Sequence, residues 1–254
     1  MKLGLEGKRV LITGSSKGIG LATARTYAEE GCSLILAARS ADDLDEAAAQ
    51  LQGHPVEIIA ADLSQENERE RLARASGALD ILVNNAGAIP GGDIFGLSMA
   101  AIEAGFALKL MGYIHLTKLV LEGMKLRRRG KIINIIGDLG RAPKWDYVAG
   151  TTANAALIAF TEAVGARSTD FNVSVFGINP AGTQTERVEQ VARGRAESLY
   201  GDRERWRDVL TNLPYGGLCS PEAVARLIVS LSADDLGYLS GNVMDFDGGL
   251  RNRR

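Results

Sequence analysis

The sequence predicts an α/β protein in which a doubly wound parallel sheet is covered by helices on both faces. Short runs rich in Val, Ile and Leu recur along the chain, as in strands that are buried on both faces. Segments of helical length separate most of these runs, and such alternation produces parallel sheets with right-handed crossovers. The expected strands are Arg9–Thr13, Ser33–Ala38, Val56–Ala60, Ile81–Asn84, Lys131–Ile136, Val173–Ile178 and Asn242–Phe246, and the clearest helical segments are Leu21–Glu30, Asp42–Gln52 and Ala100–Leu121.

Size and composition fit a single domain, residues 1–254, because no linker or shift in composition divides the chain. The 29 Lys and Arg against 31 Asp and Glu give a net charge of -2, which offers no basic surface for nucleic acid or an anionic membrane. The two cysteines suit a reducing compartment. With no secretory segment at the N-terminus, and no apolar run near the ~18 residues of a spanning helix, we expect a cytoplasmic protein without membrane association.

Residues 185–214, called the lid segment below, interrupt this alternation of strands and helices. The segment is charged and irregular, and long excursions of this kind often cover a functional site. It is interpreted either as a substrate loop or lid, or as a solvated excursion of the surface.

A glycine-rich loop, Thr13–Gly20, follows the first expected strand and runs directly into a helix. Gly14 permits the tight turn, Gly18 lets the backbone approach a pyrophosphate, and Gly20 lets the helix pack closely on the strand. The free N–H groups at the start of the helix, together with its dipole, favour a bound anion. The context therefore predicts a dinucleotide-binding site.

The end of the second expected strand indicates which nucleotide is bound. Ala38 stands where an acidic residue would pair with the ribose 2′-hydroxyl of NAD(H), and Arg39 follows it. Arg39 and Lys17 together offer two cations for an adenosine 2′-phosphate, which favours NADP(H).

With these motifs, the chain resembles the short-chain dehydrogenase/reductase family over nearly its full length. Besides the glycine loop, the resemblance includes Asp62-Leu63, the NNAG motif Asn84–Gly87, the INPAG motif Ile178–Gly182 and the tail Gly241–Gly249. It implies a Rossmann-type fold with a seven-stranded sheet, nicotinamide binding and a homo-dimer or homo-tetramer. The residues expected to bind the cofactor are Gly14, Ser16, Lys17, Gly18, Ile19, Gly20, Arg39, Asp62, Leu63, Asn85, Ala86, Gly87, Pro180 and Thr185.

The catalytic Asn-Ser-Tyr-Lys tetrad of the family has no counterpart in the ungapped alignment. Lys109 stands at the Asn position, Gly137 at the Ser position, Gly150 at the Tyr position and Asn154 at the Lys position. A competing alignment takes Tyr147 as the family's Tyr, but its motif then ends in Thr rather than Lys and requires a deletion.

The two changes at Lys109 and Asn154 resemble an exchange of residues between facing helices. A Lys side chain reaches ~6 Å along apolar surface, so Lys109 is a candidate to deliver the catalytic charge from the opposite wall; the alternative is that it extends outward at a subunit boundary. Tyr147 is the nearest substitute for the missing proton donor, because glycine at position 150 leaves room for its ring, and Tyr113 is a second candidate. Asp138 could contact the substrate or pair with Lys109, or serve only as a turn residue.

Two functions are compatible with these residues. The first is an NADP(H)-dependent oxidoreductase with an atypical centre, formed by Lys109, Tyr147, Asp138 and Asn154, that transfers hydride to or from a small carbonyl, alcohol or activated alkene. The second is an NADP(H)-binding pseudoenzyme acting as a sensor or scaffold, and a lyase or isomerase without net redox change is a third possibility. No clustered Cys, His and acidic residues argue for a metal site.

Overall fold

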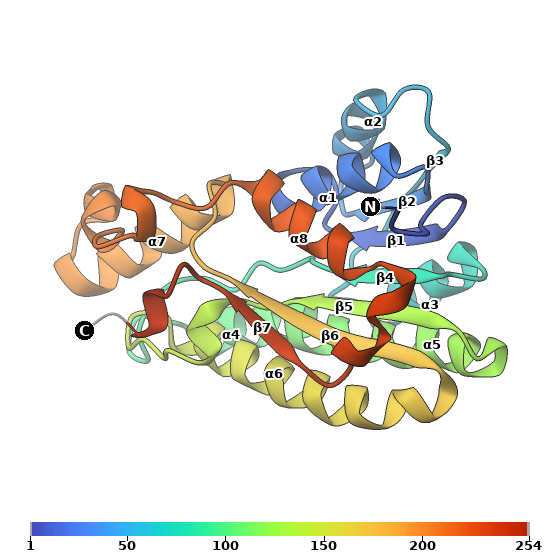
Figure 1. The fold of residues 1–254 in the computed structure, drawn as a ribbon. Helices are drawn as coiled ribbons and strands as arrows, with labels where there is room; N and C mark the ends of the chain where they lie inside the picture. Colours follow the sequence, from blue (N-terminus) through green and yellow to red (C-terminus); the bar gives the residue numbers. More distant parts are fainter. Residues whose placement is uncertain (1, 253–254) are drawn as a thin grey trace.

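The computed structural model describes residues 2–252 and confirms the predicted fold class. Seven parallel strands form one sheet in the order β3-β2-β1-β4-β5-β6-β7, so the chain winds outward in both directions from β1 and β4 (Figure 1). Four strands match their predicted bounds, and the other three shift only at their ends. The strands are β1 Arg9–Thr13, β2 Ser33–Ala38, β3 Val56–Ala60, β4 Ile81–Asn84, β5 Gly130–Ile135, β6 Val173–Pro180 and β7 Val243–Phe246.

Helices cover both faces of the sheet (Figure 1). Alternate residues of a strand point to opposite faces: Ile12 packs in the core beneath α1, α2 and α8, whereas Leu11 packs in the core beneath α3 and α5. Burial on both faces explains why the central strands have largely apolar runs, whereas the edge strand β3 is partly exposed and contains Glu57. The helices are α1 Gly18–Glu29, α2 Ala41–Ala49, α3 Glu66–Ser76, α4 Met99–Phe106, α5 Gly112–Arg127, α6 Val148–Ser168, α7 Glu186–Tyr200 and α8 Pro221–Leu231.

Helices α4 and α5 form one continuous helix, Met99–Arg127, joined by a π-helical turn at Ala107–Met111. By length and mean hydropathy alone this helix could cross a membrane, contrary to the expectation that no such run exists. Here α5 packs against the sheet and against α3 and α6, and a core helix passes the same test. The π turn contains Lys109, and such turns occur frequently at functional sites.

The lid segment is more regular than the sequence indicates. Thr185 caps the N-terminus of α7, and its hydroxyl accepts a hydrogen bond from the Val188 N–H at 3.4 Å. A 3₁₀ segment, Arg203–Val209, folds back against α7. In Figure 1 this pair of elements projects from the body of the molecule at the left.

Candidate active site

A large cavity of about 1860 Å³ opens between the lid segment and the ends of the strands β1, β2, β5 and β6. Ligands of doubly wound sheets bind at the carboxyl ends of the strands. The cavity is lined by every expected cofactor residue except Gly20 and Asp62, and by all four expected catalytic residues. The carboxylate of Asp62 instead accepts a hydrogen bond from the Ser64 N–H at 3.0 Å.

The glycine loop requires glycine at the positions that the sequence singled out. Gly14 and Gly18 adopt φ values of +64° and +57°, which favour glycine. A Cβ on Gly14 would lie 2.9 Å from the Ala86 Cα, and a Cβ on Gly20 would lie 2.8 Å from the Asn85 side chain. The Asn85 side chain in turn donates hydrogen bonds to the carbonyls of Thr13 and Gly14, at 3.0 and 3.1 Å. The loop is therefore built for close backbone packing around an open helix N-terminus.

A buried polar atom without a partner, deeper in the cavity, bears on whether a nicotinamide nucleotide fits this site. The Oδ1 atom of Asn154 is buried and accepts no hydrogen bond from any residue between 2 and 252. A buried acceptor without a partner costs about 1–3 kcal/mol. A ribose hydroxyl is a donor of the required kind. The residues present therefore fit the cofactor.

The two cations expected at the adenosine end differ in their surroundings. Lys17 pairs with Glu186 across the cavity mouth, with Nζ 2.5 Å from the carboxylate, and both side chains are exposed. Arg39 is exposed, lines the cavity and makes no ion pair within residues 2–252. Arg39 is therefore the cation that is ready for a phosphate, whereas Lys17 would have to leave Glu186.

Lys109 points inward, toward the end of β5. It is half-buried, and its Nζ donates a hydrogen bond to the Ile136 carbonyl at 2.6 Å. The stem runs past Gly87, where an added Cβ would lie 3.1 Å from the Lys109 Cδ. Burial, together with repulsion from the nearby Arg187, lowers the pKa of Lys109 to about 7. Lys109 can therefore exchange a proton with its surroundings at neutral pH.

Tyr147 occupies the space above Gly150, as expected from the glycine, although it precedes α6 rather than lying on it. Helix α6 begins after Tyr147, whose backbone has the non-helical angles φ −144° and ψ 37°. The N–H of Val148 bonds the carbonyl of Gly92, which holds this segment to the neighbouring loop. A Cβ on Gly150 would lie 2.6 Å from the Tyr147 Cε2 and closer still to Cζ. Glycine at position 150 therefore makes room for the phenol ring.

Tyr113 has a different environment. It is buried, it does not line the cavity, and its hydroxyl donates a hydrogen bond to the Ile135 carbonyl at 2.9 Å. Burial raises its pKa well above the ordinary range. Tyr113 therefore supports the end of β5, and Tyr147 is the phenol that faces the cavity.

Asn154 and Asp138 border the position that the family's Ser would occupy. Gly137 has a φ of +141°, and a Cβ there would lie 2.9 Å from the Asn154 Nδ2. Asp138 begins the short 3₁₀ turn Asp138–Gly140. Burial raises its pKa to about 6, and the negative charge of Asp247 contributes. Asp138 forms no ion pair with Lys109, although both line the cavity.

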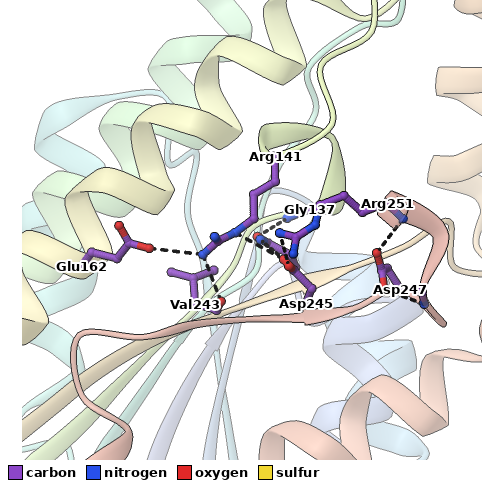
Figure 2. Close-up of polar contacts among 9 residues, drawn as sticks. Gly137, Arg141, Glu162, Val243, Asp245, Asp247 and Arg251 are labelled. Carbon is purple, nitrogen blue, oxygen red and sulfur yellow. Dashed lines mark hydrogen bonds and ion pairs between the residues drawn. The ribbon is translucent and has the colours of Figure 1, made fainter. Parts of the chain in front are cut away.

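A polar network fixes this turn to β7 (Figure 2). Asn179 accepts a hydrogen bond from the Gly137 N–H at 3.4 Å and donates one to Asp245 at 2.8 Å. Arg141, at the end of the turn, lies 3.4 Å from Asp245 and 3.2 Å from Glu162. These contacts hold the backbone at Gly137, which in turn places the neighbouring Asp138.

The sequence analysis missed Arg187, a half-buried residue in the first turn of α7. Its guanidinium donates a hydrogen bond to the Ile89 carbonyl and also bonds the Tyr147 side chain. Burial raises the pKa of Tyr147, whereas Arg187 acts to lower it. The only sequence signal was its place two residues after Thr185, in a segment where most charged side chains face solvent.

One cluster of possible metal ligands lies outside the cavity. The ligand atoms of Glu66, Glu70 and His115 lie within 4.8 Å of one another on α3 and α5. His115 Nδ1 already accepts a hydrogen bond from Arg69 Nε at 3.1 Å, which removes one ligand atom. We assign no metal to this cluster.

The chain belongs to the short chain dehydrogenase family, whose model matches residues 8–196. It is 29% identical to the 3-oxoacyl-(acyl-carrier-protein) reductase FabG of Thermotoga maritima, over 97% of this chain and 98% of that protein. It is 32% identical to the D-beta-hydroxybutyrate dehydrogenase of Cupriavidus necator, over 96% and 98%. Among solved structures, the L-sorbose reductase of Gluconobacter frateurii, complexed with NADPH and L-sorbose, matches with a TM-score of 0.89 at 29% identity and covers 100% of both chains. Short-chain oxidoreductase chemistry with a nicotinamide cofactor and a small-molecule substrate is thus supported.

Proposed function

We propose that this protein is an NADP(H)-dependent oxidoreductase that reduces a small carbonyl compound with a rearranged catalytic centre. The observation that carries the proposal is the position of Tyr147, whose ring fills the space above Gly150 and faces the same cavity as Lys109 and Asn154. A phenol, an amine and an orphaned amide oxygen are therefore present in the cavity, although all four tetrad positions carry other residues.

Each side chain has a separate role in the proposed reaction. A nicotinamide held in this cavity would supply the hydride for reduction of a substrate carbonyl. Tyr147 donates its proton to the carbonyl oxygen, because burial raises its pKa and keeps the phenol protonated at neutral pH. Arg187 stabilises the phenolate that remains, which then regains its proton from water.

The other residues orient the reactants. Lys109, held at the Ile136 carbonyl, supplies positive charge beside the reacting centre, and Asn154 Oδ1 accepts a hydrogen bond from the ribose. Asp138 has a pKa of about 6 and contacts the polar part of the substrate. The lid segment covers the cavity opening from the side of α7.

Preference for NADP(H) is part of the proposal, and Arg39 carries it. A phosphate bound to Arg39 gains a charge-assisted contact, whereas an NAD(H) ribose leaves this cation without a partner. Changing Arg39 to Asp is therefore expected to weaken NADPH binding and to strengthen NADH binding, measured by nucleotide fluorescence. An unchanged preference for NADPH would refute this assignment.

Turnover tests the proposed reaction directly. NADPH oxidation is followed against panels of aldehydes, ketones and enones with the wild type, Lys109→Met and Tyr147→Phe, after NADPH affinity has been measured for each. We expect both variants to bind NADPH and to lose about 10²- to 10⁴-fold in kcat, the usual contribution of general acid catalysis. Tight NADPH binding without turnover of any compound by the wild type would instead indicate a nucleotide-binding pseudoenzyme.

A further inference from the structure

Two cationic side chains, Lys109 and Arg187, line the same cavity and have no acidic partner. They are close enough for Arg187 to depress the pKa of Lys109 by repulsion. Within residues 2–252 neither forms an ion pair, and the hydrogen bonds they donate go to the carbonyls of Ile136 and Ile89 and to Tyr147. Unpaired charges in a partly desolvated site are costly, so they are uncommon without a ligand.

Two other cations of the cavity wall are neutralised within the protein, whereas Arg39 is exposed at the adenosine end. Lys17 pairs with Glu186 at 2.5 Å, and Arg195 pairs with the buried carboxylate of Asp146 at 2.7 Å. Asp138 also lines the cavity, but it forms no ion pair with Lys109 or Arg187, and the charges that shift its pKa are those of Asp247 and Arg195. Lys109 and Arg187 differ from the unpaired Arg39 because they are half-buried, so their charges are partly removed from solvent.

Arg187 has donors left for a ligand. A guanidinium carries five N–H donors, and Arg187 uses them on only two groups, the Ile89 carbonyl and the Tyr147 side chain. Its planar fork matches the two oxygens of a carboxylate, which a Lys ammonium does not. Arg187 contacts Tyr147, the proposed proton donor. A substrate whose carboxylate is bound by Arg187, and whose carbonyl is only a few bonds away from that carboxylate, would therefore have its carbonyl near Tyr147.

We propose that the substrate is an oxo acid whose carboxylate is bound by Arg187, with Lys109 as the second cation. This inference rests on the proposed oxidoreductase function and specifies its substrate class. Arg187 then determines specificity by selecting the carboxylate, in addition to stabilising the Tyr147 phenolate.

The kinetic test compares acids with their neutral esters. NADPH oxidation is measured with 2-oxobutanoate, acetoacetate and 4-oxopentanoate, and with the methyl ester of each, using the wild type and Arg187→Met. The matched control is Arg203→Met, which removes the same charge from an exposed residue of the lid segment. We expect the wild type and the control to prefer at least one acid over its ester, and Arg187→Met to lose about 10- to 100-fold of that preference, as for a hydrogen bond to a charged group.

The ratio of the rate with each acid to the rate with its ester distinguishes two roles of Arg187, namely recognition of the substrate carboxylate and attachment of the lid segment. If Arg187 only ties α7 to the loop at Ile89, its removal slows acids and esters alike and leaves their ratio unchanged. An unchanged ratio would overturn the proposal. So would a variant that retains the acid preference but binds NADPH at least tenfold more weakly, because Arg187 would then serve the cofactor.

The second measurement does not depend on turnover. Malonate and the neutral malonamide are titrated into the NADPH complexes of all three proteins at constant ionic strength, and binding is followed by calorimetry and thermal shift. We expect malonate, but not malonamide, to bind the wild type and Arg203→Met, and to bind Arg187→Met at least tenfold more weakly. If malonate binds but no compound is turned over, the proposed anion site is supported and the proposed redox function is refuted. If neutral ketones are reduced but malonate binding does not depend on Arg187, the redox function is retained and the anion site is refuted.

Discussion

Placing a methyl group on Gly150 is expected to move the proposed proton donor without touching its chemistry. The added Cβ would lie 2.6 Å from the Tyr147 Cε2 and closer still to Cζ, whereas ordinary contacts begin at 3.4 Å, so the ring must withdraw by more than about 0.8 Å. A displacement of ~1 Å in a catalytic group can cost ~10²-fold in rate. Gly150→Ala should therefore lower kcat for carbonyl reduction by about 100-fold while NADPH still binds.

The assay combines single and double variants. Tyr147→Phe should lose about 10²- to 10⁴-fold in kcat, and adding Gly150→Ala to it should cost little more, because the two changes act on one phenol. The matched control is Gly123→Ala in α5, where an added Cβ meets only the end of the Arg127 side chain, at 3.2 Å. Gly123→Ala should leave kcat unchanged.

Folding must be checked, because overpacking costs roughly 1–3 kcal/mol. Thermal unfolding by circular dichroism distinguishes a folded, inactive Gly150→Ala from an unfolded one. A folded Gly150→Ala with kcat within threefold of the wild type would refute the reasoning. The reasoning would also be refuted if the kcat losses of Tyr147→Phe and Gly150→Ala multiplied in the double variant, because the two changes would then not act on the same phenol.

Two further predictions concern stability as a function of pH. The pKa of Lys109 is about 7 in the folded protein against 10.5 when exposed, so its charge destabilises the fold fully below pH ~7 and less as the pH rises toward 10.5. Lys109→Met should therefore raise the Tm most near pH 6. A gain in Tm that does not depend on pH would contradict this prediction. The pKa of Asp138 is raised to about 6 from 3.8, so its ionised form destabilises the fold above pH ~6 and not below pH ~4. Asp138→Asn should raise the Tm at pH 8 and leave it unchanged at pH 4, and a lower Tm at pH 8 would show that the carboxylate has a stabilising partner.

The sheet was predictable because its strands are buried on both faces. The runs at Arg9–Thr13 and Ile81–Asn84 have apolar centres bounded by polar residues, and pattern and structure agree to the residue. The glycine loop was equally clear, since Gly14 and Gly18 adopt conformations that favour glycine. Local physical constraints of this kind leave a direct mark on the sequence.

The site was less predictable because it depends on contacts between distant segments. Nothing near Tyr147 shows that α6 begins one residue later, because the bond from Val148 to Gly92 is a tertiary contact. The π turn that contains Lys109 has no distinct periodicity over its five residues. Arg187 was missed because periodicity cannot tell which charged side chain of the lid segment turns inward. The proposed exchange of Lys109 and Asn154 rests only on the ungapped comparison with the family pattern.

A crystal structure with NADPH bound tests the central claim most directly, namely that the catalytic cation now comes from the helix of Lys109. We predict that the Lys109 ammonium stays at the Ile136 carbonyl and approaches the nicotinamide ribose, with Asn154 Oδ1 accepting a ribose hydroxyl. An ammonium directed into solvent or toward a second subunit, with the nucleotide in place, would contradict the account.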